Sequence, residues 1–275
     1  MRPLVKQSLL IFLVLTLASC EKKIDWPVMG DGNSQLVVYG MITSELKTQE
    51  IVINHTITGP NDEPEAYSGA QVIVSTTDSV YSFAEDSLNP GHYYSQKEFA
   101  GIAGKEYSLF INANGNIISG KATMLPVSDF TFLQLGQAET SDMMKITWVA
   151  EPYNSTEPAM YEILLDWSAV EGFEGKPNDS TSARLLYYTL PTIDVSQLFA
   201  PVMEKITFPI GTTIIEKKYS LTNEHAAFIR AMLAETNLQG GLFNSVPANA
   251  PVTLSNSTLG HFSACEVLEK RATVK

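Results

Sequence analysis

Cys20 is the residue whose chemistry the sequence specifies most closely. It ends the tetrapeptide Leu17-Ala18-Ser19-Cys20, which follows a short apolar run and a basic start at Arg2 and Lys6. Leucine three positions before a cysteine, with small residues between them, is the lipobox pattern that a lipoprotein signal peptidase cleaves. We therefore predict that residues 1–19 are a lipoprotein signal peptide and that cleavage leaves Cys20 as an acylated N-terminus.

An acylated Cys20 would give the chain a membrane as its first partner. Each buried CH₂ group contributes about 0.8 kcal/mol to membrane binding, so several acyl chains together hold a soluble domain at a bilayer. The apolar run before Cys20 is itself too short to span a bilayer unaided. An ordinary secretory signal, with Cys20 there by chance, and an N-terminal anchor helix are the alternatives.

Other residue types that commonly do chemistry are scattered. The four histidines, His55, His92, His225 and His261, lie far apart and lack the spacing of a metal site such as His-Glu-x-x-His. The sequence also contains no glycine-rich phosphate loop and no Gly-x-Ser-x-Gly elbow. We therefore predict no catalytic residue, no metal ligand, no cofactor and no enzymatic activity.

Carboxylates are abundant, and three of them stand together in the run Asp62-Glu63-Pro64-Glu65. A calcium loop alternates its ligands around a tight glycine turn, and this proline-broken run lacks that pattern. A glycosidase needs two closely placed carboxyl groups, which no spacing in a β protein guarantees. We predict a solvated loop here and keep a hydrolase as a third hypothesis.

The charge balance excludes one class of partner. Removing residues 1–19 leaves 256 residues with 16 basic and 30 acidic side chains, a formal charge of about −14. We predict no nucleic-acid partner, because phosphate binding needs clustered Lys and Arg. If Cys20 is acylated, Cys265 has no disulfide partner within the chain, and its alternating surroundings favour a small buried hydrophobe in a strand.

The elements that must position any site are mostly strands. After a tether over residues 20–34, seven β-rich runs are separated by turn signals, among them Asn89-Pro90-Gly91 and the Asn114-Gly115 hairpin signal. This spacing predicts an N-terminal β-sandwich over residues 35–126. The seven runs are Leu36 to Ile42, Ile51 to Ile57, Gln71 to Thr76, Val80 to Phe83, His92 to Ser95, Tyr107 to Ile111 and Ile117 to Ala122.

A second β-rich part begins after Leu125-Pro126-Val127, because proline cannot continue a central strand. We predict a second sandwich over residues 127–275, with two further strands in the tail from Pro251 to Val274. The other expected strands are Met144 to Val149, Tyr161 to Trp167, Leu185 to Leu190, Ile206 to Pro209 and Thr213 to Leu221.

One helix is predicted within the second part, near residues 222–238. Thr222 is a suitable N-cap, Glu224 favours the first turn, and Gly240-Gly241 would end the helix. Its apolar stripe is expected to pack over a sheet. The stripe contains Phe228, Ile229, Met232 and Leu233.

Three short motifs resemble O-glycosylation sites of exported proteins in Bacteroides-type bacteria. They are Asp78-Ser79-Val80, Asp86-Ser87-Leu88 and Asp179-Ser180-Thr181. Such tripeptides recur by chance, so glycans at Ser79, Ser87 or Ser180 are a hypothesis.

The order of several segments along the chain resembles a Bacteroidetes lipoprotein family catalogued as domain of unknown function 4249. No single segment is diagnostic. The matching segments are Cys20-Glu21-Lys22-Lys23-Ile24-Asp25, Leu36-Val37-Val38-Tyr39-Gly40-Met41-Ile42, Ser68-Gly69-Ala70-Gln71-Val72, Gly91-His92-Tyr93-Tyr94, Gly104-Lys105-Glu106-Tyr107-Ser108-Leu109 and Leu259-Gly260-His261-Phe262-Ser263-Ala264.

The resemblance implies an outer-membrane lipoprotein, often encoded beside a TonB-dependent transporter, and brings no catalytic residues. It also implies an N-terminal sandwich that is Ig-like or resembles carboxypeptidase regulatory domains; for the second part we expect a fibronectin-like sandwich. Lys22 and Lys23 stand where a surface-export signal would have further acids. Both the cell surface and the periplasmic face of the outer membrane therefore remain open.

The leading hypothesis is a non-enzymatic accessory or solute-binding lipoprotein that captures a nutrient, such as a peptide or glycan, for a TonB-dependent outer-membrane transporter. Sandwich domains can present binding loops, and anchorage keeps a captured solute near its uptake partner. The alternative is a structural or adhesive cell-envelope protein.

Overall fold

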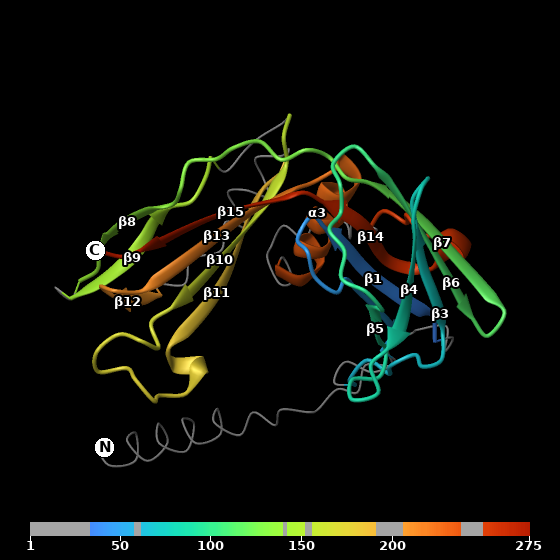
Figure 1. Ribbon diagram of the computed structural model, residues 1–275, viewed down its shortest axis with the longest axis horizontal. Helices are drawn as coiled ribbons and strands as arrows, with labels where there is room; N and C mark the ends of the chain where they lie inside the picture. The colour runs from blue at the N-terminus through green and yellow to red at the C-terminus, as the bar shows by residue number, and fades with distance from the viewer. Residues whose placement is uncertain (1–33, 58–61, 140–141, 152–155, 191–205, 238–249) are drawn as a thin grey trace, which may run out of the picture. The chain divides into compact units, whose positions relative to one another are not determined.

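The computed structural model describes residues 34–57, 62–139, 142–151, 156–190, 206–237 and 250–275, without the side chains of residues 234–237. Within these residues the fold is mainly β, with one α-helix. The strands form a nearly closed, barrel-like sheet of eight strands and two smaller antiparallel sheets of four and three strands (Figure 1). No helix in the described residues is long and apolar enough to cross a bilayer. Cys20, the signal peptide and the Gly240-Gly241 helix end lie outside the described residues.

The eight-stranded sheet has the order β14-β1-β2-β5-β4-β3-β6-β7. All seven predicted N-terminal strands are confirmed, and the Asn114-Gly115 hairpin has the positive φ angles it requires, 51° and 90°. The strand bounds are β1 Leu36–Thr43, β2 Glu50–His55, β3 Gln71–Ser75, β4 Val80–Glu85, β5 His92–Ser95, β6 Glu106–Ala113, β7 Asn116–Thr123 and β14 Leu259–Cys265.

The two ends of this strand order, β7 and β14, approach each other closely. A Cβ atom placed on Gly120 of β7 would lie 3.6 Å from the Cβ atom of Phe262 in β14 and 2.7 Å from a methyl carbon of Leu254. Just beyond β7, Leu125 forms an isolated parallel bridge with Cys265. Glycine at position 120 therefore permits the approach that nearly closes the sheet around its apolar core. We call this line of approach between β7 and β14 the seam.

Two features of the first part differ from the prediction. Its strands form one continuous hydrogen-bonded sheet, where a sandwich would have two facing sheets. The tail strand β14, expected to help close the second part, instead pairs in parallel with β1, from Val37↔Leu259 to Thr43↔Cys265. A parallel neighbour so distant in sequence leaves no turn signal, because parallel pairing needs a long crossover.

The second part consists of two antiparallel sheets with the orders β11-β10-β13-β15 and β12-β9-β8. Side chains from both sheets share one apolar core, among them Ile146 and Phe208 from the smaller sheet and Ile163 and Ile214 from the larger one. The sequence missed β8, whose residues Gln-Leu-Gly-Gln carry little β propensity. The bounds are β8 Gln134–Gln137, β9 Met143–Trp148, β10 Ala159–Asp166, β11 Ser182–Thr189, β12 Thr207–Pro209, β13 Thr213–Ser220 and β15 Val267–Thr273, with short 3₁₀ turns at Asn178–Ser180 and Ser255–Ser257.

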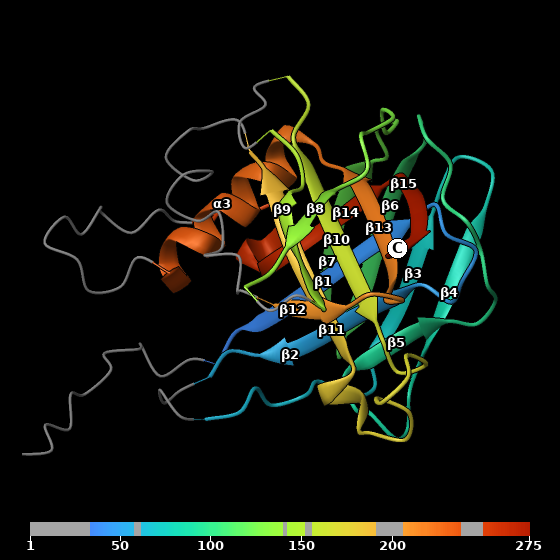
Figure 2. The same ribbon diagram turned by 90° about the vertical axis from the view of Figure 1, so that its left-hand side faces the viewer.

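Helix α3, Asn223–Asn237, begins where the sequence predicts. The Thr222 side-chain oxygen accepts a hydrogen bond from the backbone N–H of His225 at 3.1 Å, which is the expected N-cap contact. The helix lies beside β14 in both Figure 1 and Figure 2. The predicted apolar stripe is wrong at one position: Met232 is 45% exposed, whereas His225, Ala226 and Ala231 are buried.

Candidate functional site

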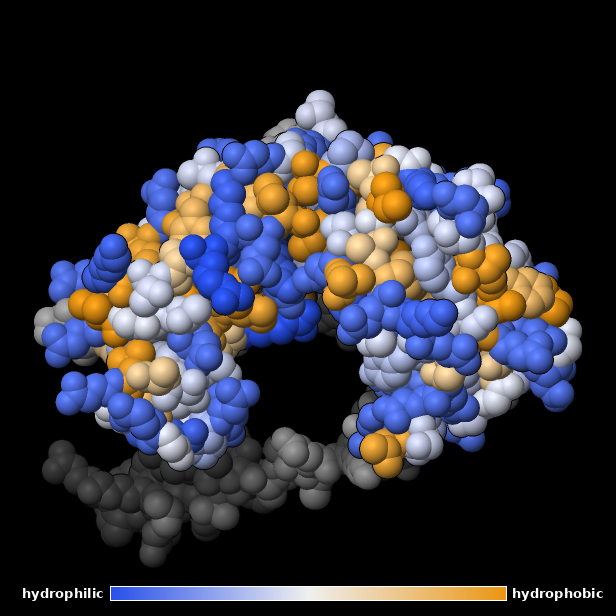
Figure 3. Space-filling view, in the orientation of Figure 1, coloured by the Kyte–Doolittle hydropathy of each residue, from blue (hydrophilic) through white to orange (hydrophobic). Residues whose placement is uncertain are grey.

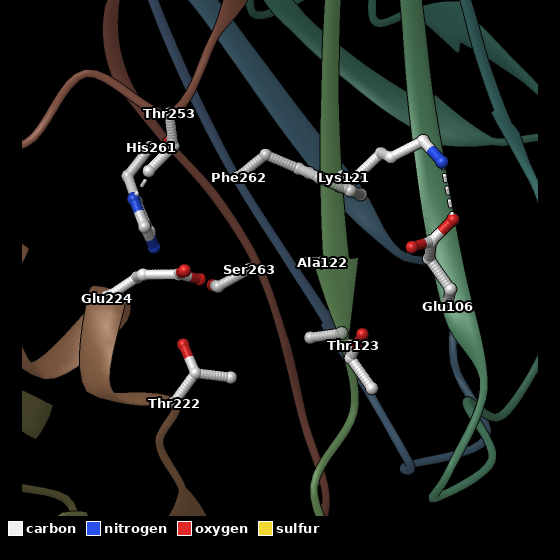
Figure 4. A pocket seen from close by; sticks show the side chains of 11 residues that line it. Glu106, Lys121, Ala122, Thr123, Thr222, Glu224, Thr253, His261, Phe262 and Ser263 are labelled. Carbon is white, nitrogen blue, oxygen red and sulfur yellow. Dashed lines mark hydrogen bonds and ion pairs between the residues drawn. The ribbon is translucent and has the colours of Figure 1, made fainter.

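A pocket of about 280 Å³ lies beside the N-terminal end of α3, over the seam (Figure 4). Its lining comes from β6, β7, β14, the first turn of α3 and the segment before Ser255. The lining residues are Glu106, Lys121, Ala122, Thr123, Thr222, Glu224, Thr253, His261, Phe262, Ser263 and Ala264.

Strand alternation explains why this pocket is polar although it adjoins an apolar core. In β14, Phe262 and Ala264 belong to the core, so His261 and Ser263 point to the opposite face of the strand. In β7, Ile118 is buried in the same core and Lys121 is exposed. The outward-facing side chains of the two strands therefore form opposite walls of the pocket.

The segment carrying Thr253 is held against β7 by side-chain contacts. The backbone N–H of Ser119 donates to Ser255 Oγ at 2.8 Å, and Asn256 Nδ2 donates to the Ile117 carbonyl at 2.7 Å. These bonds satisfy edge groups of β7 that no neighbouring strand covers. They also fix Thr253 at the rim of the pocket.

His261 is the most constrained polar residue of the lining. Its ring stacks on Phe228 and on His225, with centroid distances of 4.7 Å in each case. Nδ1 lies 3.2 Å from Thr253 Oγ1, and Nε2 has no hydrogen-bond partner among the described residues. Burial lowers the pKa of His261 to about 4 and that of His225 to about 3, so both rings are neutral at neutral pH.

The charges of the lining do not balance. Lys121 Nζ lies 2.7 Å from Glu106 Oε1, so the cation of the lining is already paired. Glu224, in the first turn of α3, makes no ion pair or side-chain hydrogen bond within the described residues. The pocket therefore presents one unpaired carboxylate together with neutral hydroxyl and imidazole groups.

The tertiary structure brings together residues that the sequence left apart. His225 and His261 stack, and Cys265 Sγ lies 3.7 Å from His225 Nδ1, whereas His55 and His92 contact Ser34 and Glu50 elsewhere. Cys265 is buried, as predicted, and this burial raises the pKa of its thiol to about 12, which disfavours the reactive thiolate. Within the described ranges no three His, Cys, Asp or Glu side chains could hold a metal ion.

A second polar cluster, which no sequence pattern predicts, joins the linker segment 126–133 to β13. Lys218 Nζ lies 2.6 Å from Ser128 Oγ and 3.2 Å from Glu157 Oε1, and Ser128 Oγ donates to the same carboxylate. Burial raises the pKa of Glu157, but hydrogen bonds from Ser128 and Lys218 lower it below its ordinary value overall. This is an ion pair bridged by a hydroxyl, in which the lysine is committed to the carboxylate and is not a base for the serine.

Glu216 is a buried acid in the core of the second part. It is fully buried, its Oε2 accepts the backbone N–H of Leu133 at 2.8 Å, and its Oε1 has no hydrogen-bond partner among the residues that the structure describes. Burial raises its pKa to about 7, although the Leu133 N–H and the nearby charge of Lys270 act in the opposite direction. The hydrogen bond from Leu133 holds the linker segment on β13. Burying the ionised carboxylate costs free energy, so the contribution of Glu216 to stability depends on pH.

The remaining predicted positions lie on the surface. All four residues of the run 62–65 are exposed, which confirms a solvated loop. Ser87 and Ser180 are exposed and Ser79 is half-buried, so glycosylation at these sites stays a prediction.

Comparison with protein families gives one finding. Residues 21–271 match the family model described as "Domain of unknown function (DUF4249)". No curated protein matches the sequence significantly.

Proposed function

Because the chain belongs to the DUF4249 family, we propose that it is an outer-membrane lipoprotein of a Bacteroidetes bacterium, which captures or positions a small polar nutrient for a TonB-dependent transporter. The lipobox ending at Cys20 supports the anchorage, and the family resemblance supports the transporter as partner. The fibronectin-like assignment of the second part belongs to the same proposal, whereas the continuous eight-stranded sheet of the first part does not fit an Ig-like or carboxypeptidase-regulatory-like sandwich.

The observation that carries solute capture is the pocket over the seam. Its volume of about 280 Å³ is slightly below the usual range for ligand sites, about 300–1,000 Å³, so it suits one sugar ring or one end of a short peptide. Its hydroxyl, carboxylate and imidazole groups can orient a polar ligand by hydrogen bonds. The visible face of the molecule is largely hydrophilic, with apolar residues scattered among polar ones (Figure 3).

Anchorage to a membrane would make a site of this small size useful for uptake. A lipid at Cys20 would confine the pocket to the membrane that holds the transporter, and confinement raises the effective concentration of a captured solute near its partner. Neither part of this arrangement requires catalysis, so we propose a binding protein and not an enzyme.

Calorimetric screening of short peptides and oligosaccharides tests the pocket directly. The variant Thr123→Trp would fill it, and we expect any binding to weaken at least tenfold. Thr77→Trp, which places the same side chain on the exposed β3–β4 turn, is the matched control and should bind normally. Equal binding by both variants would place the ligand elsewhere and would contradict this site.

The partner is tested separately. Affinity purification of the lipidated protein from native membranes should recover a TonB-dependent transporter component, and mass spectrometry should find acyl chains on Cys20. Recovery of no transporter component, or an unmodified Cys20, would count against the proposal. An intact mass of the native protein larger than the acyl chains on Cys20 account for would support glycans at Ser79, Ser87 or Ser180.

One observation favours the alternative of an adhesive or structural envelope protein. Phe110 on β6 and Ile117 on β7 are 40% and 41% exposed, and they are diagonal neighbours in the β6–β7 register. Self-association that Phe110→Ser abolishes, without binding of any soluble ligand, would support adhesion over capture.

A further inference from the structure

We propose that the pocket over the seam binds the primary ammonium group of a small ligand, with Glu224 and His261 as its recognition residues. This inference rests on the proposed function of solute capture, and it names the chemical class of the solute. A free peptide N-terminus and an amino sugar both carry this group.

The first step of the argument is charge. The cation of the described lining, Lys121, is neutralised by Glu106 at 2.7 Å, while Glu224 is left without an ionic partner among the described residues. A carboxylate so placed repels an anionic ligand and attracts a cationic one. The excess of acidic residues in the chain, a formal charge of −12, acts in the same direction.

The second step is hydrogen-bond complementarity. In Figure 4 the side chains of Glu224, His261 and Ser263 gather on one wall of the pocket, and Thr222 lies next to Glu224. When His261 Nδ1–H donates to Thr253 Oγ1, Nε2 offers its lone pair to the pocket. A primary ammonium has three N–H donors and no acceptor, so a carboxylate, an imidazole nitrogen and a hydroxyl oxygen can accept all three.

The third step is preorganisation. His261 is 2% exposed and is held between Phe228 and His225, so its ring cannot turn away when the pocket is empty. Thr222 is likewise fixed, because its side chain caps α3. A site with fixed acceptors loses little entropy on binding, which favours a small ligand that makes few contacts.

Two matched ligand pairs test the proposal by isothermal titration calorimetry on the intact mature protein. The first pair is trialanine and N-acetyl-trialanine, and the second is glucosamine and N-acetylglucosamine. We expect at least one free amine to bind ten times more tightly than its acetylated counterpart. The pair that shows the difference identifies the source of the ammonium group.

The variant Glu224→Gln should weaken binding of that free amine at least tenfold, because it removes the charge and keeps the shape. Glu106→Gln, which leaves the Lys121 cation of the same pocket unpaired, should also weaken binding, but less than Glu224→Gln does. Glu98→Gln, an exposed site outside the lining, controls for net charge. The comparison of free and acetylated ligands on the unmodified protein does not depend on how any variant folds.

Equal affinity for both members of each pair, no binding of any of the four, or full binding by Glu224→Gln would overturn the inference. Neutral ligands test the proposed function separately. If maltose or N-acetyl-trialanine binds at least as tightly as trialanine and glucosamine, and Thr123→Trp abolishes this binding, solute capture stands while the ammonium assignment fails. If no peptide or saccharide binds at all, both fail.

Discussion

The core inside the eight-stranded sheet and the core between the two smaller sheets accommodate polar groups in different ways. In the first core, the buried tyrosines keep their hydroxyl groups at the margin, where Tyr93 donates to the Tyr67 carbonyl at 2.8 Å and Tyr107 accepts the Ile102 N–H at 2.7 Å. The second core holds Glu216, a full carboxyl group with one oxygen that no described residue hydrogen-bonds. Phenols do not titrate near neutral pH, but this carboxyl group does.

The packing of α3 on β14 is a third region with buried polar groups, and its stability depends on pH in the opposite direction to that of Glu216. His225 and His261 are buried between α3 and β14, and burial favours their neutral forms. Low pH therefore destabilises the packing of α3, because it protonates the two histidines. High pH destabilises the packing around Glu216, because it ionises the carboxyl group. The lesson is that one chain can be destabilised at both ends of the pH range by different regions, and each region can be tested alone.

The largest expected effect concerns the first core. Phe262→Ala should lower the free energy of unfolding by about 3–5 kcal/mol, because it leaves a cavity beside Gly120. Since no titrating group of that core is involved, urea denaturation at pH 5 and pH 8 should give the same loss. Phe110→Ala, at a site 40% exposed, should cost much less. A loss that varies strongly with pH would break the contrast between the two cores.

Glu216→Gln should change stability by about 2–3 kcal/mol, in a pH-dependent way. The folded-state pKa of about 7 lies above the ordinary value of 4.5, so the folded state holds the proton more tightly than the unfolded state. Stability should fall as pH rises from 4.5 to 7 and stay low above 7. The glutamine variant should therefore be more stable than the parent at pH 8 and similar to it at pH 4.

Thermal denaturation across pH 4 to 8 measures this effect, and Glu98→Gln is the control at an exposed site. A glutamine variant less stable than the parent at pH 8 would show that the ionised carboxylate is stabilised in the fold, against the argument from burial.

His225→Phe should reduce the loss of stability at acid pH, by about 1–2 kcal/mol in the free energy of unfolding at pH 5. The folded-state pKa of about 3 lies below the ordinary 6.5, so the unfolded state binds the proton more tightly. Stability contributed by the neutral ring is complete above pH 6.5 and is lost as pH falls towards 3. Phenylalanine keeps an aromatic ring against His261 and removes this loss.

The readout is the slope of stability against pH between 4.5 and 6.5, which should become shallower in His225→Phe. His55→Phe, at the C-terminal end of β2 and away from α3, should leave the slope unchanged. An unaltered slope in His225→Phe would mean that the ring is not the origin of the acid sensitivity.

Thr222→Ala should give the smallest effect, about 1 kcal/mol at every pH, because it removes only the N-cap of α3. Thr222→Ser should restore most of the loss, since serine supplies the same oxygen. Circular dichroism and chemical denaturation at two pH values would separate this uniform loss from the pH-dependent effects above.

Local patterns predicted most elements of the fold. Strand β1 is an almost continuous run of apolar residues, and β6 alternates buried residues with more exposed ones. The start of α3 follows from Thr222 and the residues after it. The exceptions are instructive. β8 has a polar, glycine-containing sequence and exists because it pairs with β9, and Met232 is exposed because the helix turns His225 and Ala226 towards β14.

The candidate site was much harder to predict. Its residues come from segments separated by more than a hundred positions, with Glu106 and Lys121 on one hairpin and Glu224 and His261 far along the chain. Nothing in the sequence around His261 indicates that His225 and Phe228 will stack on it. The alternation around Cys265 did carry a usable signal, because it correctly predicted a buried strand.

By itself the sequence determined the β-rich class, the position of most strands, the capped start of the helix and the lipobox on which the predicted anchorage rests. These depend on neighbours a few residues apart, whose periodicity and turn chemistry act locally. Only the tertiary structure decided that β14 joins β1, that Gly120 lets the sheet nearly close, and that Glu216 is buried with one oxygen that no described residue hydrogen-bonds. Those outcomes depend on contacts between distant segments, and their energies come from burial and close packing that no local pattern encodes.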